Sequence, residues 1–434
     1  MAALLDWFAA NARDLPWRRT RDPYAVWVSE IMLQQTQVKT VIPFWERWLR
    51  ELPTIESLAN ASPEKIHKLW EGLGYYTRVR NLQKAAQVIV AQHGGKFPKD
   101  FDDVLALPGI GRYTAGAICS IAFNQPAPIL DGNAIRVLTR IFGMAENPKE
   151  KKTNARLWKL AEELVAHASR ITHHKVKSRT RTKDEDDCCS HLNQSLMELG
   201  ALVCTPRNAQ CLICPVKKLC VALTEGRVEE LPNLGRREKA TARRFMAFVI
   251  ARDGKFLVRQ RPAGGVNAHL WEFPNVEVNG HNAGVAGIFK SEFHFAAPAI
   301  SPLVTIKHSI TRYRITLEAF VIRSEEPEIK VHGAWKTPAQ MQQLAFTSAH
   351  RKVLHALTPR RAHLGTVLGG GRRAAPSATK NRVKMRFQVA HVLKHGTGKF
   401  REPAGGKACP TAQRSGCKPS NLGFLDAFCR WPNG

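Results

Sequence analysis

Acidic residues and long apolar runs are scarce in this 434-residue sequence. It holds 36 Asp and Glu against 65 Lys and Arg, which gives a formal net charge of +29. A basic excess of this size favours a polyanionic partner such as nucleic acid, although a solubilising surface is the plainer alternative. No window of 18 apolar residues is present, so we expect no membrane-spanning helix and no membrane partner.

The N-terminal segment also lacks an export signal, because Asp6 interrupts the apolar run after a few residues. We therefore expect a cytoplasmic protein. In that reducing compartment the ten cysteines are expected to stay free of disulfides. The length of the chain predicts two domains, since a single core stops growing at about 250–300 residues.

The first half of the chain has the pattern of an all-α domain. Apolar residues recur at helical spacing through residues 1–166, and the pattern returns in "LNQSLMELGALVC", so we predict a helical domain over residues 1–225. Residues 167–190 are polar and carry blocks of charge, which predicts a disordered insertion.

The second half differs in character. A proline-containing linker over residues 226–239 precedes an expected α+β domain over 240–357. There "RFMAFVIARDGKFLVRQRP" predicts two strands joined at Asp253–Gly254, and "YRITLEAFVI" predicts another strand. Residues 358–434 have no periodicity and hold 15 Lys and Arg against 2 Asp and Glu, which predicts a disordered basic tail.

Four cysteines are crowded into 17 residues, in the order Cys-x6-Cys-x2-Cys-x5-Cys. Four thiolates this close together need a cation. Zinc sites more often use two Cys-x2-4-Cys pairs separated by a longer loop, so the compact spacing favours a [4Fe–4S] cluster. The basic residues Arg207, Lys217 and Lys218 of this loop either contact phosphates or form a solvated face. The expected ligands are Cys204, Cys211, Cys214 and Cys220.

A Gly-x-Gly turn formed by Gly109 and Gly111 in "LPGIGRYTAGAI" (107–118) precedes a helix whose free N–H groups make an anion site. "LDGNAIRVLTR" (130–140) follows it. With "WRRTRDPYAVWVSEIMLQQTQV" (17–38) and "GLGYYTRVRNL" (72–82), these motifs resemble the helix–hairpin–helix DNA glycosylases of the endonuclease III superfamily. The likeness is specifically to adenine DNA glycosylases of the MutY type, over residues 1–166 and 190–225.

Cleavage of a bond between a purine and deoxyribose needs a proton for the departing base and stabilisation of an oxocarbenium-like sugar, which is work for two carboxyl groups. Glu30 lies among apolar neighbours, where desolvation raises a carboxyl pKa, and the resemblance makes it the acid that protonates adenine N7. Asp131 taken alone fits a helix N-cap. The resemblance assigns it stabilisation of the oxocarbenium or a transient covalent bond, with Tyr113 and Asn133 as positioning residues.

Strand-cleaving relatives carry a Lys at the position of Tyr113, and its amine forms a Schiff base with the sugar. This chain offers no amine there, so the resemblance implies a monofunctional glycosylase that leaves an abasic site. The base must first be flipped out of the stack. The resemblance implies that Gln35 and either Tyr75 or Tyr76 wedge into the DNA. It also implies that Trp17, Arg18 and Leu33 line the adenine pocket.

Residues 240–357 resemble the Nudix-like domain of the same family through "FLVRQRPAGGVNAHLWEFPNVEV". The Arg-Glu-x-x-Glu-Glu cluster that holds magnesium in Nudix hydrolases is missing from this domain, so we expect recognition of 8-oxoguanine in place of pyrophosphatase activity. Where the family commonly has Phe-Ser-His, this chain has three different residues beside His308 and Ser309. They are Ile310, Thr311 and Arg312, and we expect residues 308–312 to carry the lesion preference.

The sequence thus predicts a monomeric base-excision repair enzyme of the bacterial nucleoid that removes adenine opposite 8-oxoguanine or guanine in double-stranded DNA. One alternative is a pyrimidine glycosylase like endonuclease III, which lacks the second domain and usually carries the Lys. Another is a DNA-binding scaffold without catalysis. The presence of both Glu30 and Asp131 argues against the scaffold.

Overall fold

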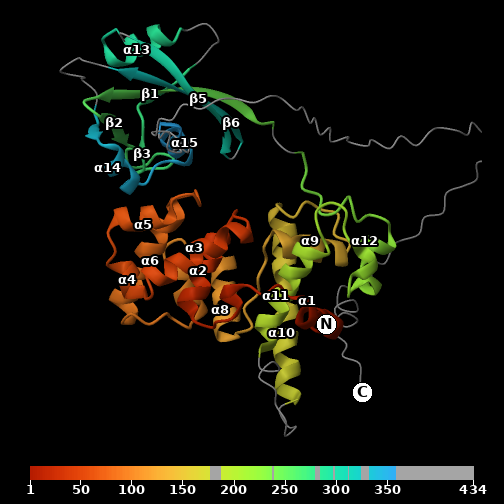
Figure 1. The fold of residues 1–434 in the computed structure, drawn as a ribbon. Helices are drawn as coiled ribbons and strands as arrows, with labels where there is room; N and C mark the ends of the chain where they lie inside the picture. Colours follow the sequence, from red (N-terminus) through yellow and green to blue (C-terminus); the bar gives the residue numbers. More distant parts are fainter. Residues whose placement is uncertain are drawn as a thin grey trace, which may run out of the picture. The chain divides into compact units, whose positions relative to one another are not determined.

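The structure is a computed structural model that describes residues 1–175, 187–236, 239–278, 284–296, 299–310, 312–323 and 332–357. The expected basic tail and the middle of the expected insertion lie outside these ranges. A helical domain comes first in the chain and a domain built on a β-sheet follows it, as the sequence predicts (Figure 1).

The first lobe of the helical domain packs short helices around buried tryptophans. Trp27, Trp48 and Trp70 are fully buried in its core. Asp22 begins the central helix by accepting hydrogen bonds from two backbone N–H groups, with Pro23 at the first helical position. The lobe consists of η1 (Pro16–Arg18), α2 (Pro23–Leu33), α3 (Val38–Glu51), α4 (Ile55–Ala59), α5 (Pro63–Trp70), α6 (Thr77–His93), α7 (Phe101–Ala106) and α8 (Arg112–Phe123).

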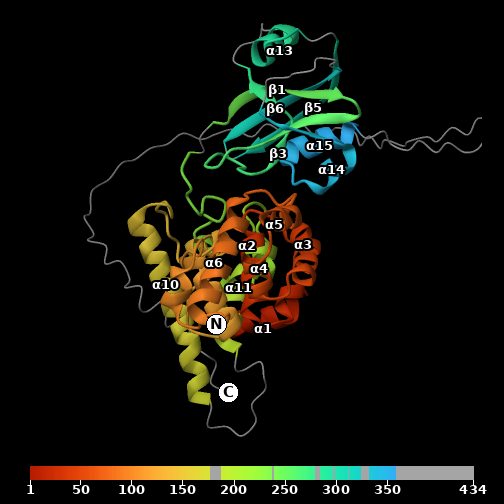
Figure 2. The same ribbon diagram turned by 90° about the vertical axis from the view of Figure 1, so that its left-hand side faces the viewer.

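The second lobe combines the N-terminal helix with the helices that follow the hairpin. Figure 2 shows the long helix α10 of this lobe, which packs against α11. No helix in the described ranges is both long enough and apolar enough to cross a membrane. The lobe consists of α1 (Ala2–Asn11), α9 (Gly132–Ile141), α10 (Lys151–Lys175), α11 (Cys188–Leu202), η3 (Cys211–Ile213), η4 (Lys217–Leu219) and α12 (Val221–Thr224).

The predicted bounds of the disordered insertion, residues 167–190, overlap the ends of two helices. Residues 167–175 continue α10, and Cys188 and Cys189 open α11. The physical reason is packing, because Ala168 and Cys189 are both buried in the core shared by the two helices. The polar composition of this segment therefore led us to miss the ends of two helices, which a few small apolar side chains anchor in the core.

The helix–hairpin–helix turn lies between α7 and α8. Gly109 has a φ of +78°, and a Cβ at this residue would lie 2.5 Å from the Cβ of Asn81 on α6. Gly111 caps α8 with a φ of −100°, which any residue can adopt. Of the two glycines singled out in the sequence, only Gly109 is thus required by the backbone.

The second domain is a mixed sheet with helices on both faces. β1 (Thr241–Arg252) and β2 (Lys255–Gln260) form the expected hairpin, since Asp253 and Gly254 both have positive φ as a two-residue turn of type I′ requires. The sheet order is β3-β2-β1-β6-β5, with β1 and β6 parallel. The remaining elements are β3 (Trp271–Glu272), β4 (Asn275–Glu277), α13 (Val285–Phe293), β5 (Ile300–Ile310), β6 (Tyr313–Arg323), β7 (Ala334–Lys336), α14 (Pro338–Gln343) and α15 (Ser348–Leu357).

Alternation along β1 builds a separate core on each face of this sheet. Met246 and Phe248 pack with α13, while Ala247 and Val249 pack with α14 and α15. Figures 1 and 2 show α13 on one side of the sheet and α14 with α15 on the other. This double burial explains why residues 245–251 of β1 form a continuous apolar run.

Candidate active site

A cavity of about 390 Å³ lies in the helical domain where residues of the two lobes meet. It is lined from η1, α2, α8, α11 and the start of α9. Eight of the site residues predicted from the sequence line this single cavity, although they come from four separate segments of the chain. They are Trp17, Arg18, Glu30, Leu33, Gln35, Tyr113, Asp131 and Asn133.

Glu30 is the buried acid of the cavity. Its side chain belongs to α2, the residue is 4% exposed, and Oε2 accepts a hydrogen bond of 2.6 Å from the hydroxyl of Tyr113. Burial raises the pKa of Glu30 to about 7, against the lowering effect of this hydrogen bond. At neutral pH a substantial fraction of Glu30 is therefore protonated.

Tyr113 pairs with Glu30, which differs from its expected role beside Asp131. The resemblance gave Tyr113 the role of positioning Asp131. In the structure, burial raises the pKa of Tyr113, and the nearby Glu30 and Asp131 raise it further. Its phenol, at the start of α8, donates to the acid on α2. The tyrosine is thus a hydrogen-bond donor to the candidate acid.

Asp131 is the second carboxyl group, and it caps α9. Its Oδ1 accepts from the backbone N–H of Ala134 at 2.7 Å, and its Oδ2 accepts from Nδ2 of Asn133 at 2.8 Å. Burial raises the pKa of Asp131, while the N–H groups of Ala134 and Asn133 act in the opposite direction. The capping role and the cavity role are thus filled by the same side chain.

Arg13 and Glu198 also line the cavity, and neither was predicted from the sequence. Glu198 on α11 is 1% exposed and accepts hydrogen bonds from both Arg13 and Arg18. Burial raises the pKa of Glu198, but the hydrogen bonds from the two guanidinium groups outweigh it and lower the pKa to about 2. The available signal was an acidic residue inside the apolar run "SLMELGALV", the same signal that pointed to Glu30.

The candidate DNA-wedging residues have unusual backbone angles. Gln35 and Tyr75 have φ values of +56° and +47°, in the left-handed region that non-glycine residues rarely adopt. Tyr75 is 43% exposed, whereas Tyr76 is 2% exposed and its ring lies edge-on to His67. Of the two tyrosines, only Tyr75 is therefore free to enter DNA.

A chain of hydrogen bonds connects Asp131 to the cysteine loop through α9. The Oδ1 of Asn133, which holds Asp131, accepts from Nη2 of Arg136 at 2.8 Å, and Nε of Arg136 donates to the carbonyl of Cys204 at 2.7 Å. One turn further along α9, Nη1 of Arg140 donates to Sγ of Cys204 at 3.3 Å. The site and the loop are thus joined by one helix.

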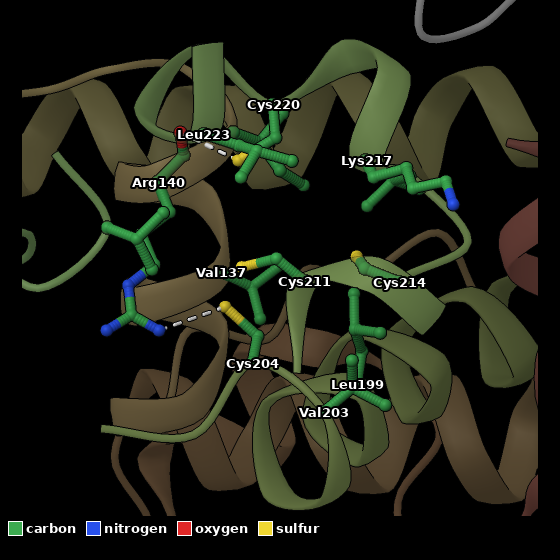
Figure 3. A pocket seen from close by; sticks show the side chains of 13 residues that line it. Val137, Arg140, Leu199, Val203, Cys204, Cys211, Cys214, Lys217, Cys220 and Leu223 are labelled. Atoms are coloured by element: carbon green, nitrogen blue, oxygen red, sulfur yellow. Dashed lines mark hydrogen bonds between the residues drawn. The ribbon is translucent and has the colours of Figure 1, made fainter. Parts of the chain in front are cut away.

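The four predicted ligands line one small cavity of the second lobe. Figure 3 shows the sulfurs of Cys204, Cys211, Cys214 and Cys220 around a common space, with Val137, Leu199 and Val203 also lining it. Every cysteine in the described ranges is free of disulfides. In the same ranges, no three His, Cys, Asp or Glu side chains lie close enough together to bind a single metal ion.

The expected lesion-reading residues lie at the tip of the β5–β6 hairpin. Strand pairing runs to Ile310 on β5 and Tyr313 on β6. Ser309 and Arg312 are exposed, and the Nη2 of Arg312 donates to the hydroxyl of Tyr313 at 3.3 Å. His308 is half-buried, and its Nδ1 has no protein partner in the described structure. Thr311 lies outside the described residues.

Comparison with known families identifies both domains. The HhH-GPD superfamily of base excision DNA repair proteins matches residues 28–163, and the NUDIX domain family matches residues 246–356. The adenine DNA glycosylase of Rattus norvegicus is 34% identical over 461 residues, which cover 90% of this chain and 85% of the relative. The adenine DNA glycosylase of Homo sapiens is 33% identical over 451 residues, which cover 89% and 79%.

One solved structure of a DNA glycosylase is also similar to part of this chain. A thermostable thymine-DNA glycosylase is similar with a TM-score of 0.44 at 28% identity, and the likeness covers 52% of this chain and 94% of that protein.

Proposed function

Because this chain belongs to the adenine DNA glycosylases, which act on N-glycosyl bonds, we propose that its substrates are A:8-oxoguanine and A:guanine mispairs in double-stranded DNA. The observation that carries the proposal is the buried Glu30, which shares a cavity with Asp131 and keeps a proton near neutral pH. The proposal takes the protein to act as a monomer, because every cavity residue that the mechanism uses belongs to one chain.

Glu30 is the general acid for the departing base. Its Oε proton passes to N7 of adenine as the C1′–N9 bond breaks, so that adenine leaves as a neutral base. The hydroxyl of Tyr113 holds the Glu30 carboxyl group in place through the 2.6 Å hydrogen bond. Arg18, fixed by Glu198, provides donors for the acceptor edge of the base.

Asp131 works on the sugar side of the broken bond. Its carboxylate stabilises the positive charge of the oxocarbenium, or forms a transient bond to C1′, until water completes the hydrolysis. The hydrogen bonds from Ala134 and Asn133 oppose protonation of this carboxylate and fix its orientation. Asn133 is thereby the positioning residue for Asp131.

The product is an abasic site in an intact strand. Strand cleavage by a glycosylase needs an amine that attacks C1′ and forms a Schiff base. Tyr113 occupies the start of α8 and donates to Glu30, so no amine is present at this position. The enzyme is therefore monofunctional.

Adenine enters the cavity after base flipping, and two residues fill the space that it leaves. Gln35 and the exposed Tyr75 support this role by their position on tight, left-handed turns. The apolar side of the pocket is formed by Trp17 and Leu33, which both line the cavity. Tyr76 is part of the core and is no longer a candidate.

Recognition of 8-oxoguanine is assigned to the β5–β6 hairpin tip of the Nudix-like domain, residues 308–312. The exposed Ser309 and Arg312 offer donors for the O8 carbonyl that distinguishes 8-oxoguanine from guanine. An Arg312→Ala variant is expected to lower, without abolishing, the ratio of A:8-oxoguanine to A:guanine excision rates.

The cysteine loop is assigned a [4Fe–4S] cluster. Four free thiols line one cavity, and the N–H of Arg140 points at Sγ of Cys204, as suits a sulfur that carries negative charge. A cubane places four irons between four cysteine ligands, and the compact Cys-x6-Cys-x2-Cys-x5-Cys spacing suits it better than the two separated Cys-x2-4-Cys pairs that are more usual for zinc. The cluster would cross-link the loop and shape its basic surface for phosphates.

Metal analysis of anaerobically purified protein tests this assignment. We expect about four iron and four sulfide per chain and a visible absorption band that Cys211→Ser removes. Stoichiometric zinc without iron would show that the assignment is wrong.

One assay tests the substrate and the chemistry together. Duplexes with a single A:8-oxoguanine, A:guanine, A:C or thymine-glycol pair are incubated with enzyme and then treated, or not treated, with alkali. We expect cleavage of the first two duplexes only after alkali, and none with Glu30→Gln. Cleavage at thymine glycol, or cleavage without alkali, would instead favour the endonuclease III type of activity.

A further inference from the structure

Arg78, the second residue of α6, holds the end of α2. Its Nη1 donates hydrogen bonds to the carbonyls of Ile31, Met32 and Gln34 at 2.7, 3.1 and 2.7 Å. The last carbonyls of a helix have no partner within the helix. A cation at this end also interacts favourably with the partial negative charge of the helix dipole. Arg78 thus caps α2 from another helix, immediately before the turn that carries Gln35.

The other nitrogen of the same guanidinium holds a second segment. Nη2 of Arg78 donates to the carbonyls of Leu73 and Gly74 at 3.1 and 3.2 Å. The guanidinium carbon also lies 5.3 Å from the ring centre of Trp70 and 5.7 Å from that of Tyr75. Burial lowers the pKa of Arg78 to about 10, so the group remains a cation at neutral pH.

Both segments need outside support. Gln35 and Tyr75 each have a left-handed backbone, and residues in that region persist only where their surroundings hold them. The carbonyls of Gln34 and Gly74, one residue before each of them, both accept from Arg78. A single planar group therefore sets the spacing between the two turns.

We propose that Arg78 is a positioning residue that holds Gln35 and Tyr75 in one register for entry into DNA. The inference rests on the proposed wedging role of these two residues. Arg78 itself contacts neither the base nor the sugar, and it acts before the chemical step. Its loss is expected to impair base flipping while the glycosidic chemistry of an already flipped base is retained.

The test compares Arg78→Met with Arg47→Met as a matched control. Arg47 on α3 is also half-buried, stacks on Phe44 at 4.8 Å and donates to the carbonyl of Leu69 at 2.7 Å, but it touches neither turn. Each variant is made in full-length enzyme that also carries Glu30→Gln. Base flipping is then followed by the fluorescence of 2-aminopurine placed opposite 8-oxoguanine in a DNA duplex. Helical circular dichroism verifies the fold, and Arg78→Lys, which keeps the charge, replaces the Met variant if that variant does not fold.

We expect Arg78→Met to reduce the flipped fraction by roughly 10-fold or more, since small misplacements of positioning groups have large kinetic effects, and Arg47→Met to leave it unchanged. A double-mutant cycle separates positioning from general stability. In an Arg78→Met background, Tyr75→Ala should reduce the flipped fraction by a several-fold smaller factor than it does in the parent enzyme.

Two results would overturn the inference, and they differ from each other. If Tyr75→Ala reduces flipping by the same factor with and without Arg78, the arginine does not act through the wedge. If Tyr75→Ala and Gln35→Ala each leave flipping unchanged, the proposed wedge itself fails and the inference falls with it.

Discussion

At the scale of single residues, one cavity holds two buried glutamates whose pKa values are shifted in opposite directions. The pKa of Glu198 is lowered to about 2 by Arg13 and Arg18, whereas that of Glu30 is raised to about 7 by burial. Hydrogen bonds from the two guanidinium groups decide the pKa of Glu198, and desolvation decides that of Glu30. Near neutral pH the site therefore offers one fixed anion and one available proton.

The first prediction concerns the pH dependence of the chemical step. Because the general acid must be protonated, the single-turnover excision rate should fall as the pH rises through about 7, by about 10-fold per pH unit on the alkaline side. Glu30→Gln should lose about 10²- to 10⁴-fold in rate and show no such fall. An alkaline limb that persists in Glu30→Gln would assign the titration to another group.

The second prediction is that ionisation of Glu30 destabilises the fold above neutral pH. Since burial raises the pKa of Glu30 from 4.5 to about 7, its stabilising contribution is complete below pH 4.5 and is lost as the pH rises through 7. Glu30→Gln should thus be more stable than wild type at pH 8, by at most about 3 kcal/mol. Urea unfolding at pH 8 and pH 5 measures the difference, which should shrink at the lower pH.

The sequence revealed these acids unequally. Glu30 and Asp131 lie inside contiguous motifs whose neighbours identify them, so both could be predicted from the sequence alone. Arg13 and Glu198 meet across 185 positions of the chain, and a sequence gives no distance between such residues. The choice between Tyr75 and Tyr76 likewise depends on burial, which differs between adjacent positions of one turn.

At the scale of elements, α9 and α11 approach closely behind the site. A Cβ on Gly200 of α11 would lie 2.6 Å from the Cβ of Asn133 and 3.1 Å from its Cα. The obstacle is partly backbone, so it cannot swing aside. The absence of a side chain at Gly200 therefore fixes where the start of α9, and with it Asp131, lies.

The third prediction follows from this contact. Gly200→Ala should push Asn133 away and lower the excision rate by roughly 10- to 100-fold, with a loss of about 1–3 kcal/mol from overpacking. Gly287→Ala on α13 is the control, because its added methyl meets no atom within 4 Å, and it should be neutral or stabilising. Wild-type excision by Gly200→Ala would mean that the helices can separate without moving Asp131.

Local patterns predicted most elements, and they failed where packing outweighed composition. The turn at Asp253–Gly254 and the strands around it were correct because turn chemistry and apolar alternation are local signals. The end of α10 was missed because residues 167–175 look polar, although Ala168 anchors the helix in the core. The two opposite helical layers of the sheet followed from no local signal.

At the scale of the whole molecule, much of the positive charge lies in the sequence after residue 357. Residues 358–434 carry a net +13 of the total +29. Contacts between such charges and phosphates release counterions, which makes affinity depend on salt in proportion to the number of contacts. In the proposed mechanism, specific excision depends instead on residues that line the cavity of the helical domain.

The fourth prediction separates these contributions. Removal of residues 358–434 should leave the single-turnover excision rate within about 2-fold, since no cavity residue is lost. The slope of log affinity for undamaged duplex against log salt should become shallower. Binding measured from low to high salt decides the matter, and an unchanged slope would mean that the segment does not touch DNA.

The helix α9 also sets limits on insertions and deletions in the chain. Asp131 caps its first turn, and Arg136 and Arg140 meet Cys204 one turn apart on a shared face. One added residue rotates everything after it by about 100°. An insertion within α9 would therefore separate the carboxylate from the cysteine loop, whatever residue was inserted. We expect the length of this helix to tolerate less variation than its exposed side chains.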